Sequence, residues 1–289
     1  MNNLNGKKIF MTGSTSGFGK VAALEMANNG ASVLTTFRNQ EKADALLNDF
    51  KRQYPNAAGS IDFVQCDLNA FDSINKACTE VGEKINGLDM IVNNAGIMNP
   101  KFKESADGIE QTLHVNLLAP ALILHNLSDL LKGSEEPKII NTASALHQGV
   151  IRFDDPEFKK GFKSMDAYRQ SKLGIILLGR LLSVEKAHAN INVYSLHPGV
   201  IRTEISRDFN FLMRGIFWLM GKSPEKGAET LLHLVENPAD SLEAGEYYTN
   251  KKVSSTTPES HDLKMAEQMM AMIKEYLKGH INKPSFLFD

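Results

Sequence analysis

The chain has 289 residues, of which 42% are hydrophobic and 23% are charged, and its mean hydropathy is −0.24. These values are typical of a globular protein, because disordered chains carry fewer apolar residues and a larger net charge. The 32 basic and 34 acidic side chains almost cancel, which disfavours a nucleic-acid partner. Only Cys66 and Cys78 are present, so a disulfide framework and a cysteine-based zinc site are excluded, and a cytoplasmic location is expected.

Short apolar runs typical of strands alternate with longer helical patterns along the chain. Strands are predicted at residues 8–11, 31–36, 61–66, 88–92, 138–142 and 191–196. Helices are predicted at residues 17–29, 40–53, 73–85, 109–131, 166–188 and about 260–279. No apolar run reaches the length of about 18 residues that a transmembrane segment needs. The alternation predicts an α/β fold: a single-domain, doubly wound parallel sheet of Rossmann type, spanning residues 1–289, with helices on both faces.

A glycine-rich turn, residues 12–19, lies between the first predicted strand and the first predicted helix. Glycines permit a tight turn and let the backbone approach a phosphate, and the helix N-terminus that follows attracts the anion. The spacing G-x-x-x-G-x-G differs from that of a P-loop. The candidate cofactor-binding residues of this turn are Gly13, Ser14, Thr15, Ser16, Gly17, Phe18 and Gly19. A turn that binds no ligand is the alternative interpretation.

The residues after the second predicted strand narrow the choice of ligand. Dinucleotide folds commonly place a carboxylate there to bind the ribose 2′-hydroxyl, but this chain reads Thr36-Phe37-Arg38-Asn39. Arg38 instead suits a 2′-phosphate, through charge-assisted hydrogen bonds, and Asn39 is its neighbour in the candidate site. The sequence therefore favours NADP(H) over NAD(H). A solvated arginine in a loop is the alternative.

Tyr168 and Lys172 stand four residues apart near the start of a predicted helix, so their side chains share one helical face. A free phenol has a pKa of about 10, and a nearby ammonium is expected to lower the pKa of Tyr168 toward the range of acid–base catalysis. Ser144 follows the predicted strand 138–142, at the sheet edge where parallel folds bind ligands. It can therefore hydrogen-bond an oxygen that Tyr168 protonates. Taken alone, a Tyr–Lys pair at this spacing is more often two surface neighbours.

Together, several motifs resemble those of the short-chain dehydrogenase/reductase family. They are Thr12-Gly13-x-x-x-Gly17-x-Gly19, Asn93-Asn94-Ala95-Gly96, Ser144, Tyr168-x-x-Ser171-Lys172 and Pro198-Gly199. They occur in the family's order, and jointly they are far more specific than any one of them. The segments Thr36–Asn39, Phe153–Asp155 and Leu196–Thr203 look like the retinol dehydrogenase-like branch. That resemblance implies NADP(H) and an apolar alcohol, aldehyde or ketone.

The resemblance also implies a role for each matching residue. Ser144, Tyr168 and Lys172 correspond to the catalytic triad, and Asn116 to a fourth member that holds a water in a proton relay. Tyr168 is then the general acid in reduction and the general base in oxidation, and Lys172 also binds the nicotinamide ribose. The remaining cofactor contacts are expected from Asp67, Leu68, Asn94, Ala95, Gly96, Pro198, Gly199, Ile201 and Thr203. Ala145 stands where the branch commonly has a second serine.

Residues 208–221 carry apolar side chains at helical spacing. The resemblance implies a substrate lid at about 204–222, with core or subunit packing and peripheral membrane contact as alternatives. The C-terminal helix is a candidate subunit contact, and a homodimer or homotetramer is expected. His147 and His197 are assigned to structure, and no metal is expected, because no second ligand stands at a metal-like spacing.

The sequence thus predicts an NADP(H)-dependent oxidoreductase that acts on a small apolar carbonyl or alcohol. Two other functions stay open. The first is a nucleotide-binding regulatory protein without turnover, which the intact Ser144, Tyr168 and Lys172 disfavour. The second is an epimerase or dehydratase on the same scaffold, whose polar substrates the apolar segment 209–220 disfavours.

Overall fold

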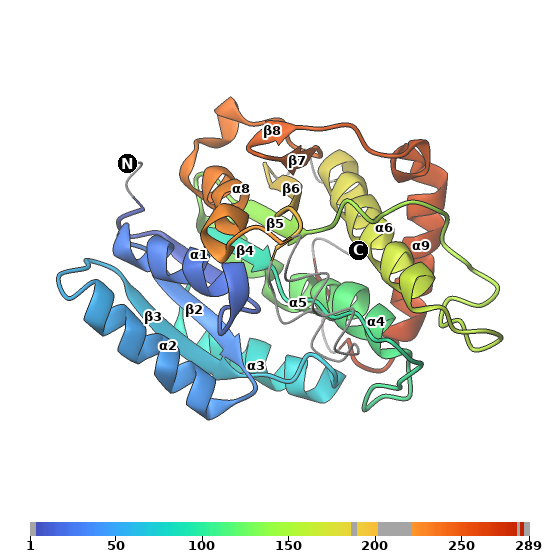
Figure 1. Cartoon of the computed structure of the whole chain (residues 1–289), viewed down its shortest axis with the longest axis horizontal. Coiled ribbons are helices and arrows are strands. Elements are labelled where there is room, and N and C mark those ends of the chain that lie inside the picture. Colours follow the sequence, from blue (N-terminus) through green and yellow to red (C-terminus); the bar gives the residue numbers. More distant parts are fainter. Residues whose placement is uncertain (1–3, 186–189, 202–220, 282–283, 286–289) are drawn as a thin grey trace.

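A computed structural model describes residues 4–185, 190–201, 221–281 and 284–285, and Figure 1 shows how its elements are arranged. The strands are β1 (Lys8–Met11), β2 (Ser32–Phe37), β3 (Ser60–Gln65), β4 (Met90–Asn93), β5 (Lys138–Thr142), β6 (Asn192–His197), β7 (Tyr247–Thr249) and β8 (Lys252–Val253). They form one sheet in the order β3-β2-β1-β4-β5-β6-β7-β8. Neighbours from β3 to β7 pair in parallel, and β8 pairs antiparallel with β7.

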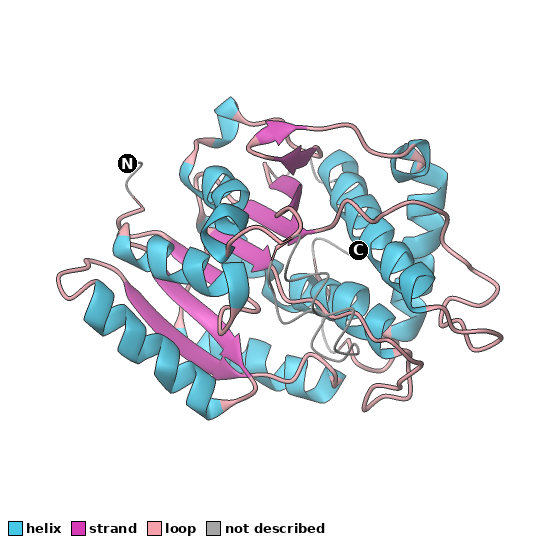
Figure 2. Ribbon diagram, viewed as in Figure 1, coloured by secondary structure: helices cyan, strands magenta, loops and turns pink. Residues whose placement is uncertain are grey.

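Helices cover both faces of this sheet, and Figure 2 shows the strands between them. The helices are α1 (Gly17–Asn28), α2 (Gln40–Gln53), α3 (Phe71–Lys84), α4 (Gln111–Leu113), α5 (Ala119–Leu127), α6 (Ser164–Glu185), α8 (Pro224–Glu236) and α9 (Leu263–Tyr276). Strand side chains alternate between the two faces. In β1, Ile9 and Met11 pack with α1, α2 and α8, whereas Phe10 packs in the cluster that contains α3, α5, α6 and α9. The doubly wound fold is therefore confirmed.

Several elements differ from the sequence-based prediction. The predicted helix 109–131 consists of α4, a π-helical turn (His114–Leu118), α5 and a 3-10 turn (Ser128–Gly133). The sequence analysis did not predict α8, β7 or β8, and the antiparallel β8 departs from the expected parallel sheet. The substrate lid predicted at about 204–222 lies outside the described residues, except for its last two positions.

The order of the strands reverses between β1 and β4. These strands are neighbours in the sheet, although β2 and β3 lie between them in the sequence. Open α/β sheets bind their ligands in the crevice at the carboxyl ends of the strands at such a switch point. The glycine-rich turn follows β1 and the Asn93–Gly96 segment follows β4, so the fold brings two of the predicted motifs to this crevice.

Candidate active site

At three positions of the glycine-rich turn the backbone conformation or the space disfavours a side chain. Gly13 has φ +75° and Gly17 has φ +58°, which is the region that favours glycine. A Cβ added at Gly19 would stand 2.2 Å from the Gly13 carbonyl oxygen. Ser16 caps α1 without a side-chain hydrogen bond, and no acidic residue stands in the first turn of that helix. The exposed N–H groups of the α1 N-terminus therefore fit a phosphate.

Thr12 and Asn94 lock this turn to the end of β4. The Thr12 hydroxyl oxygen accepts hydrogen bonds from the backbone N–H groups of Asn94 and Ala95, each at 3.1 Å. The Asn94 side-chain amide donates to the carbonyls of Gly13 (2.8 Å) and Thr12 (3.0 Å). Asn94, which directly follows β4, thus fixes the conformation of the glycine-rich turn after β1. Asn94 and Ala95 were predicted as cofactor contacts, whereas Thr12 was named only as the first residue of the glycine motif, with no role. The adjacency of β1 and β4 in a doubly wound sheet could have indicated this role.

Ser14 faces the interior of the protein. It is fully buried, and its hydroxyl lies 2.6 Å from the hydroxyl of Thr35 in β2. Thr35 donates its own proton to the Met11 carbonyl, so Ser14 is the donor of the shared bond. Only the backbone of Ser14 is therefore available to the predicted cofactor, whereas Thr15 and Ser16 are half-buried.

Arg38 and Asp67 lie at the adenine-ribose end of the predicted site. The Arg38 guanidinium is 3.9 Å from the Asp67 carboxylate, and the Arg38 side chain is 60% exposed and that of Asp67 42%. They line a cavity of about 310 Å³ together with Lys76 and Glu80. Asn39, predicted as a cofactor contact, uses its side chain to cap α2 through the Lys42 N–H. Leu68 offers its carbonyl to the His114 ring at 3.0 Å.

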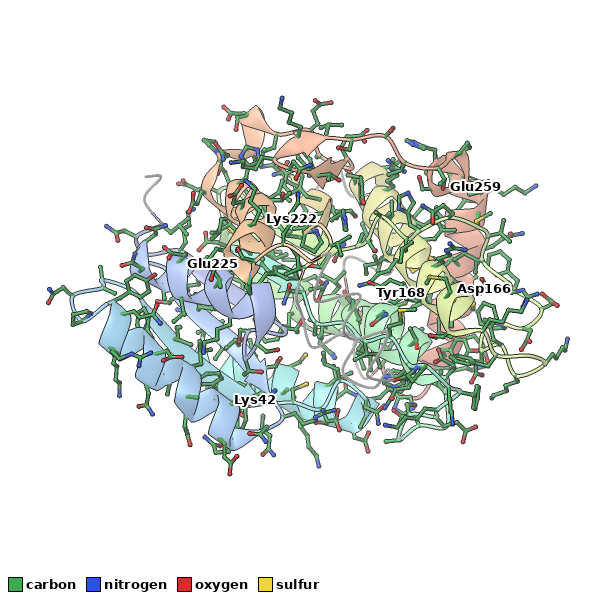
Figure 3. All side chains as sticks on the ribbon, viewed as in Figure 1. Lys42, Asp166, Tyr168, Lys222, Glu225 and Glu259 are labelled. Atoms are coloured by element: carbon green, nitrogen blue, oxygen red, sulfur yellow. The ribbon has the colours of Figure 1, made fainter. Side chains whose placement is uncertain are left out.

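Ser144, Tyr168 and Lys172 converge as the sequence predicts. Figure 3 shows Tyr168 near the start of α6, and its hydroxyl interacts with the Ser144 side chain. The Lys172 ammonium lies 5.8 Å from the centre of the Tyr168 ring and donates to the Thr142 carbonyl at 2.9 Å. A Cβ at Gly96 would stand 3.2 Å from this ammonium. The strand ends and α6 therefore bring Ser144, Tyr168 and Lys172 together, and the Lys172 ammonium lies next to Gly96.

The electrostatics of this cluster differ from the sequence-based prediction. Burial raises the pKa of Tyr168, and the hydrogen bond with Ser144 opposes this rise. Burial lowers the pKa of Lys172 to about 8. The expected lowering of the Tyr168 pKa by Lys172 is therefore wrong for this structure, because burial dominates and the ammonium points to Thr142.

Asn116 lies in the π-helical turn between α4 and α5. Its side-chain oxygen accepts from the Ile97 N–H (2.8 Å), and its amide donates to the Ile97 carbonyl (2.9 Å) and the Ser171 hydroxyl (3.0 Å). Ser171 in turn donates to the Tyr168 carbonyl. Asn116 thus joins the segment after β4 to α6. Such π turns are frequent at functional sites, and the sequence pattern indicated only a helix.

The Pro198–Gly199 turn follows β6. Gly199 has φ +95°, and the next predicted contact, Ile201, is buried with its side chain packed against Gly227 of α8. Only the Ile201 backbone is therefore available to a ligand. Thr203 lies outside the described residues. Within the part of the chain that the structure describes, no group of three or more His, Cys, Asp or Glu side chains is placed to hold a metal ion.

Comparison with known proteins identifies the family. The sequence matches the family model for short chain dehydrogenase over residues 7–211. The chain belongs to the short-chain dehydrogenase family. Retinol dehydrogenase 13 of Homo sapiens is 34% identical over 278 residues, with 92% of this chain and 83% of that protein covered. Retinol dehydrogenase 14 of Homo sapiens is 29% identical over 284 residues, with 92% and 84% covered. This short-chain dehydrogenase therefore belongs to the retinol dehydrogenase-like branch.

Solved structures share the fold of this short-chain dehydrogenase. An uncharacterized protein from Mycobacterium paratuberculosis superposes with a TM-score of 0.78 at 22% identity, covering 96% of both chains. A short chain dehydrogenase from Burkholderia cenocepacia, in complex with NADP, gives a TM-score of 0.68 at 24% identity and covers 86% of this chain and 97% of its own. The family makes the protein an oxidoreductase with a nicotinamide cofactor and a small-molecule substrate. Among the described helices, none is long and apolar enough to cross a membrane.

Proposed function

We propose that the protein transfers hydride between NADP(H) and an apolar alcohol, aldehyde or ketone, with Tyr168 as the group that exchanges the proton. The observation that carries this proposal is the meeting of Tyr168, Ser144 and Lys172, with the Lys172 ammonium beside Gly96. A bound nicotinamide supplies the hydride chemistry, and the protein supplies position and proton transfer. The relatives named retinol dehydrogenase support an apolar substrate.

Each side chain has a distinct task in this proposal. In reduction, the Tyr168 hydroxyl gives its proton to the substrate oxygen, and in oxidation the phenolate takes it back. The raised pKa of Tyr168 keeps the proton on the phenol at neutral pH, which suits its role as an acid. The Ser144 hydroxyl hydrogen-bonds the reacting oxygen. Lys172, whose ammonium is held by the Thr142 carbonyl, binds the nicotinamide ribose.

The cofactor preference rests on different residues. The turn between β1 and α1 fits the pyrophosphate through backbone N–H groups. Arg38 supplies the cation for the 2′-phosphate, which favours NADP(H) over NAD(H). A single domain for residues 1–289, a cytoplasmic location, a homodimer or homotetramer and a lid near 204–222 remain predictions.

The deciding experiment compares Tyr168→Phe with the wild-type protein. NADPH oxidation is measured across a panel of aliphatic and aromatic aldehydes and ketones. Phenylalanine keeps the ring but removes the proton, so kcat should fall by about 100-fold or more while NADPH binding, measured by fluorescence, is retained. Tyr54→Phe is the matched control, because Tyr54 bonds Glu25, outside the predicted site. Wild-type turnover in Tyr168→Phe would remove Tyr168 from the mechanism.

A further inference from the structure

His147 lies in the turn that carries Ser144. It is 4% exposed, and its Nδ1 lies 2.7 Å from the Ser144 carbonyl oxygen. Its ring stands 5.3 Å from the ring of Tyr247 in β7. The Ser144 side-chain oxygen also accepts from the Leu146 N–H at 3.1 Å. Ser144 is thus contacted by two residues that follow it closely in the chain, Leu146 and His147. Of these two, His147 also contacts elements outside the turn.

The hydrogen bonds of His147 determine where its ring proton lies. On the other side of the ring, the Thr257 backbone N–H donates to Nε2 at 3.4 Å. A carbonyl oxygen only accepts and a backbone N–H only donates, so the neutral ring must carry its proton on Nδ1. A second proton on Nε2 would face the N–H of Thr257. The neutral Nδ1–H form of His147 is thus the form in which both neighbours are satisfied.

The far end of this connection is fixed to α6. Thr257 begins the 3-10 turn Pro258–His261, and the buried Arg180 of α6 donates to both the carbonyl (2.8 Å) and the hydroxyl (2.6 Å) of Ser260 in that turn. Tyr168 lies three turns earlier on the same helix. Helix α6 therefore connects to both residues. Tyr168 is part of the helix, and Ser144 is linked to it through His147, Thr257 and the 3-10 turn that Arg180 binds.

We propose that His147 is a positioning residue, which holds the Ser144 carbonyl through its Nδ1–H group and so keeps the Ser144 hydroxyl in place beside Tyr168. This role deepens the proposed function and rests on it, since it assumes that Ser144 hydrogen-bonds the reacting oxygen. His147 itself has no contact with the substrate oxygen in this assignment. A displacement of about 1 Å in such a group can lower the rate by about 100-fold.

Three substitutions of His147 distinguish the role of Nδ1 from that of Nε2. His147→Asn places an amide nitrogen where Nδ1 stands and keeps the donor to Ser144. His147→Gln places its amide near Nε2 and loses that donor, and His147→Phe keeps only the ring shape. We expect kcat within about 3-fold of wild type for Asn, and 10- to 100-fold lower for Gln and Phe. The KM for NADPH should stay within about 2-fold, because the glycine-rich turn is untouched. Tyr54→Phe, which changes a side chain bonded to Glu25 outside this connection, is the control.

Long-range ¹H–¹⁵N spectra show which ring nitrogen of His147 carries the proton, independently of activity. The His147 signals are assigned as those that are absent from the spectrum of His147→Asn. We expect the proton on Nδ1 at neutral pH. A proton on Nε2, a cationic ring, or Gln equal to or better than Asn in kcat would overturn the assignment, even if Phe failed to fold. A wild-type protein that oxidises no NADPH with the panel would instead overturn the proposed function. An active wild type with unchanged kcat in all three variants would overturn only the role of His147.

Discussion

The Thr12 hydroxyl shows how much of the site one atom organises. It accepts two N–H groups from residues 82 and 83 positions later, at Asn94 and Ala95. Sequence motifs placed Gly13 and Asn94 in the site because glycine and asparagine have recognisable patterns in this family. Thr12 begins the same glycine motif, but the motif does not indicate which groups its hydroxyl binds. Its role follows only from the pairing of β1 with β4, which is a property of the fold.

Sequence patterns also do not show which polar side chains form hydrogen bonds within the protein and are therefore unavailable to a ligand. Asn39 and Ser14 both lie at positions that suggest cofactor contact, yet one caps α2 and the other bonds Thr35. Each polar group has been taken by the nearest unsatisfied backbone or hydroxyl partner, as buried and helix-terminal groups require. Motifs thus located the site correctly in the chain, but could not tell which atoms of these residues remain available.

Arg38 tests the cofactor preference at the scale of one side chain. Removal of its guanidinium in Arg38→Ala should raise the KM for NADPH by about 10- to 100-fold, the usual cost of a lost hydrogen bond to a charged group. The KM for NADH, which lacks the 2′-phosphate, should change little. Initial rates with both cofactors give the comparison, and Arg52→Ala on α2, which pairs with Asp49, is the control. An equal rise for both cofactors would exclude the 2′-phosphate role.

At the scale of elements, the prediction was best where the pattern is strong and local. The strands at 8–11 and 138–142 were predicted with their observed bounds, because each contains a short apolar run of the kind that buried parallel strands carry. The three-residue β7 is too short to show any period. The π-helical turn could not be predicted, since the bonds of Asn116 to Ile97 and Ser171 join segments 19 and 55 residues away. Helix α8 did carry a start signal, Ser223-Pro224, which the sequence analysis overlooked.

The C-terminus of α8 is stabilised by an unusual buried cation. Lys138, the first residue of β5, is 1% exposed, and its ammonium donates to the carbonyls of Leu234, Val235 and Asn237. These are among the carbonyls that a helix end leaves without partners, and a cation there also suits the helix dipole. Helix α8 packs on α1 and so supports the glycine-rich turn from behind.

Lys138→Met tests this element directly. Methionine fills similar space but leaves buried carbonyls without a donor, which should lower the free energy of unfolding by about 1–3 kcal/mol. Urea unfolding at pH 7 measures the change. Lys8→Met is the matched control: Lys8 also begins a strand, but its ammonium makes an exposed bond to Asn86, so the change should be within about 0.5 kcal/mol. Equal stability of the Lys138 and Lys8 variants would contradict the capping role.

At the scale of the whole molecule, the doubly wound topology was predictable because the strand and helix patterns alternate from residue 8 to residue 196. The same sheet then converts separate motifs into one site: turns after β1, β4, β5 and β6 all open at one edge. The alternation of strands and helices does not predict how the C-terminal part of the chain contacts the site. The bond from Thr257 to His147 spans 110 residues, and neither residue type is distinctive in the sequence.

The folded molecule should lose stability in mild acid because it buries histidines in their neutral form. Burial, and after it the positive charges of Lys222 and Lys172, lower the pKa of His197 to about 4 from the ordinary value of 6.5. Its Nδ1 is buried and has no hydrogen-bond partner among the described residues. Between pH 6.5 and 4 the His197 side chain is protonated in the unfolded chain but remains neutral in the folded protein. The free energy of unfolding therefore falls as the pH falls. For this one group the loss between pH 7 and pH 5 is about 2 kcal/mol.

Urea unfolding of wild type and His197→Gln at pH 7 and pH 5 isolates that loss, because every other titrating group is common to both proteins. The stability lost between the two pH values should be smaller in His197→Gln by about 2 kcal/mol. In His261→Gln the reduction should be smaller than in His197→Gln, because burial and the nearby Arg180 lower the pKa of His261 although its side chain is exposed. Parallel pH dependence in wild type and His197→Gln would mean that His197 accepts a proton in the folded protein as readily as in the unfolded chain. The environment at the end of β6 would then have to be more polar than the packing around His197 indicates.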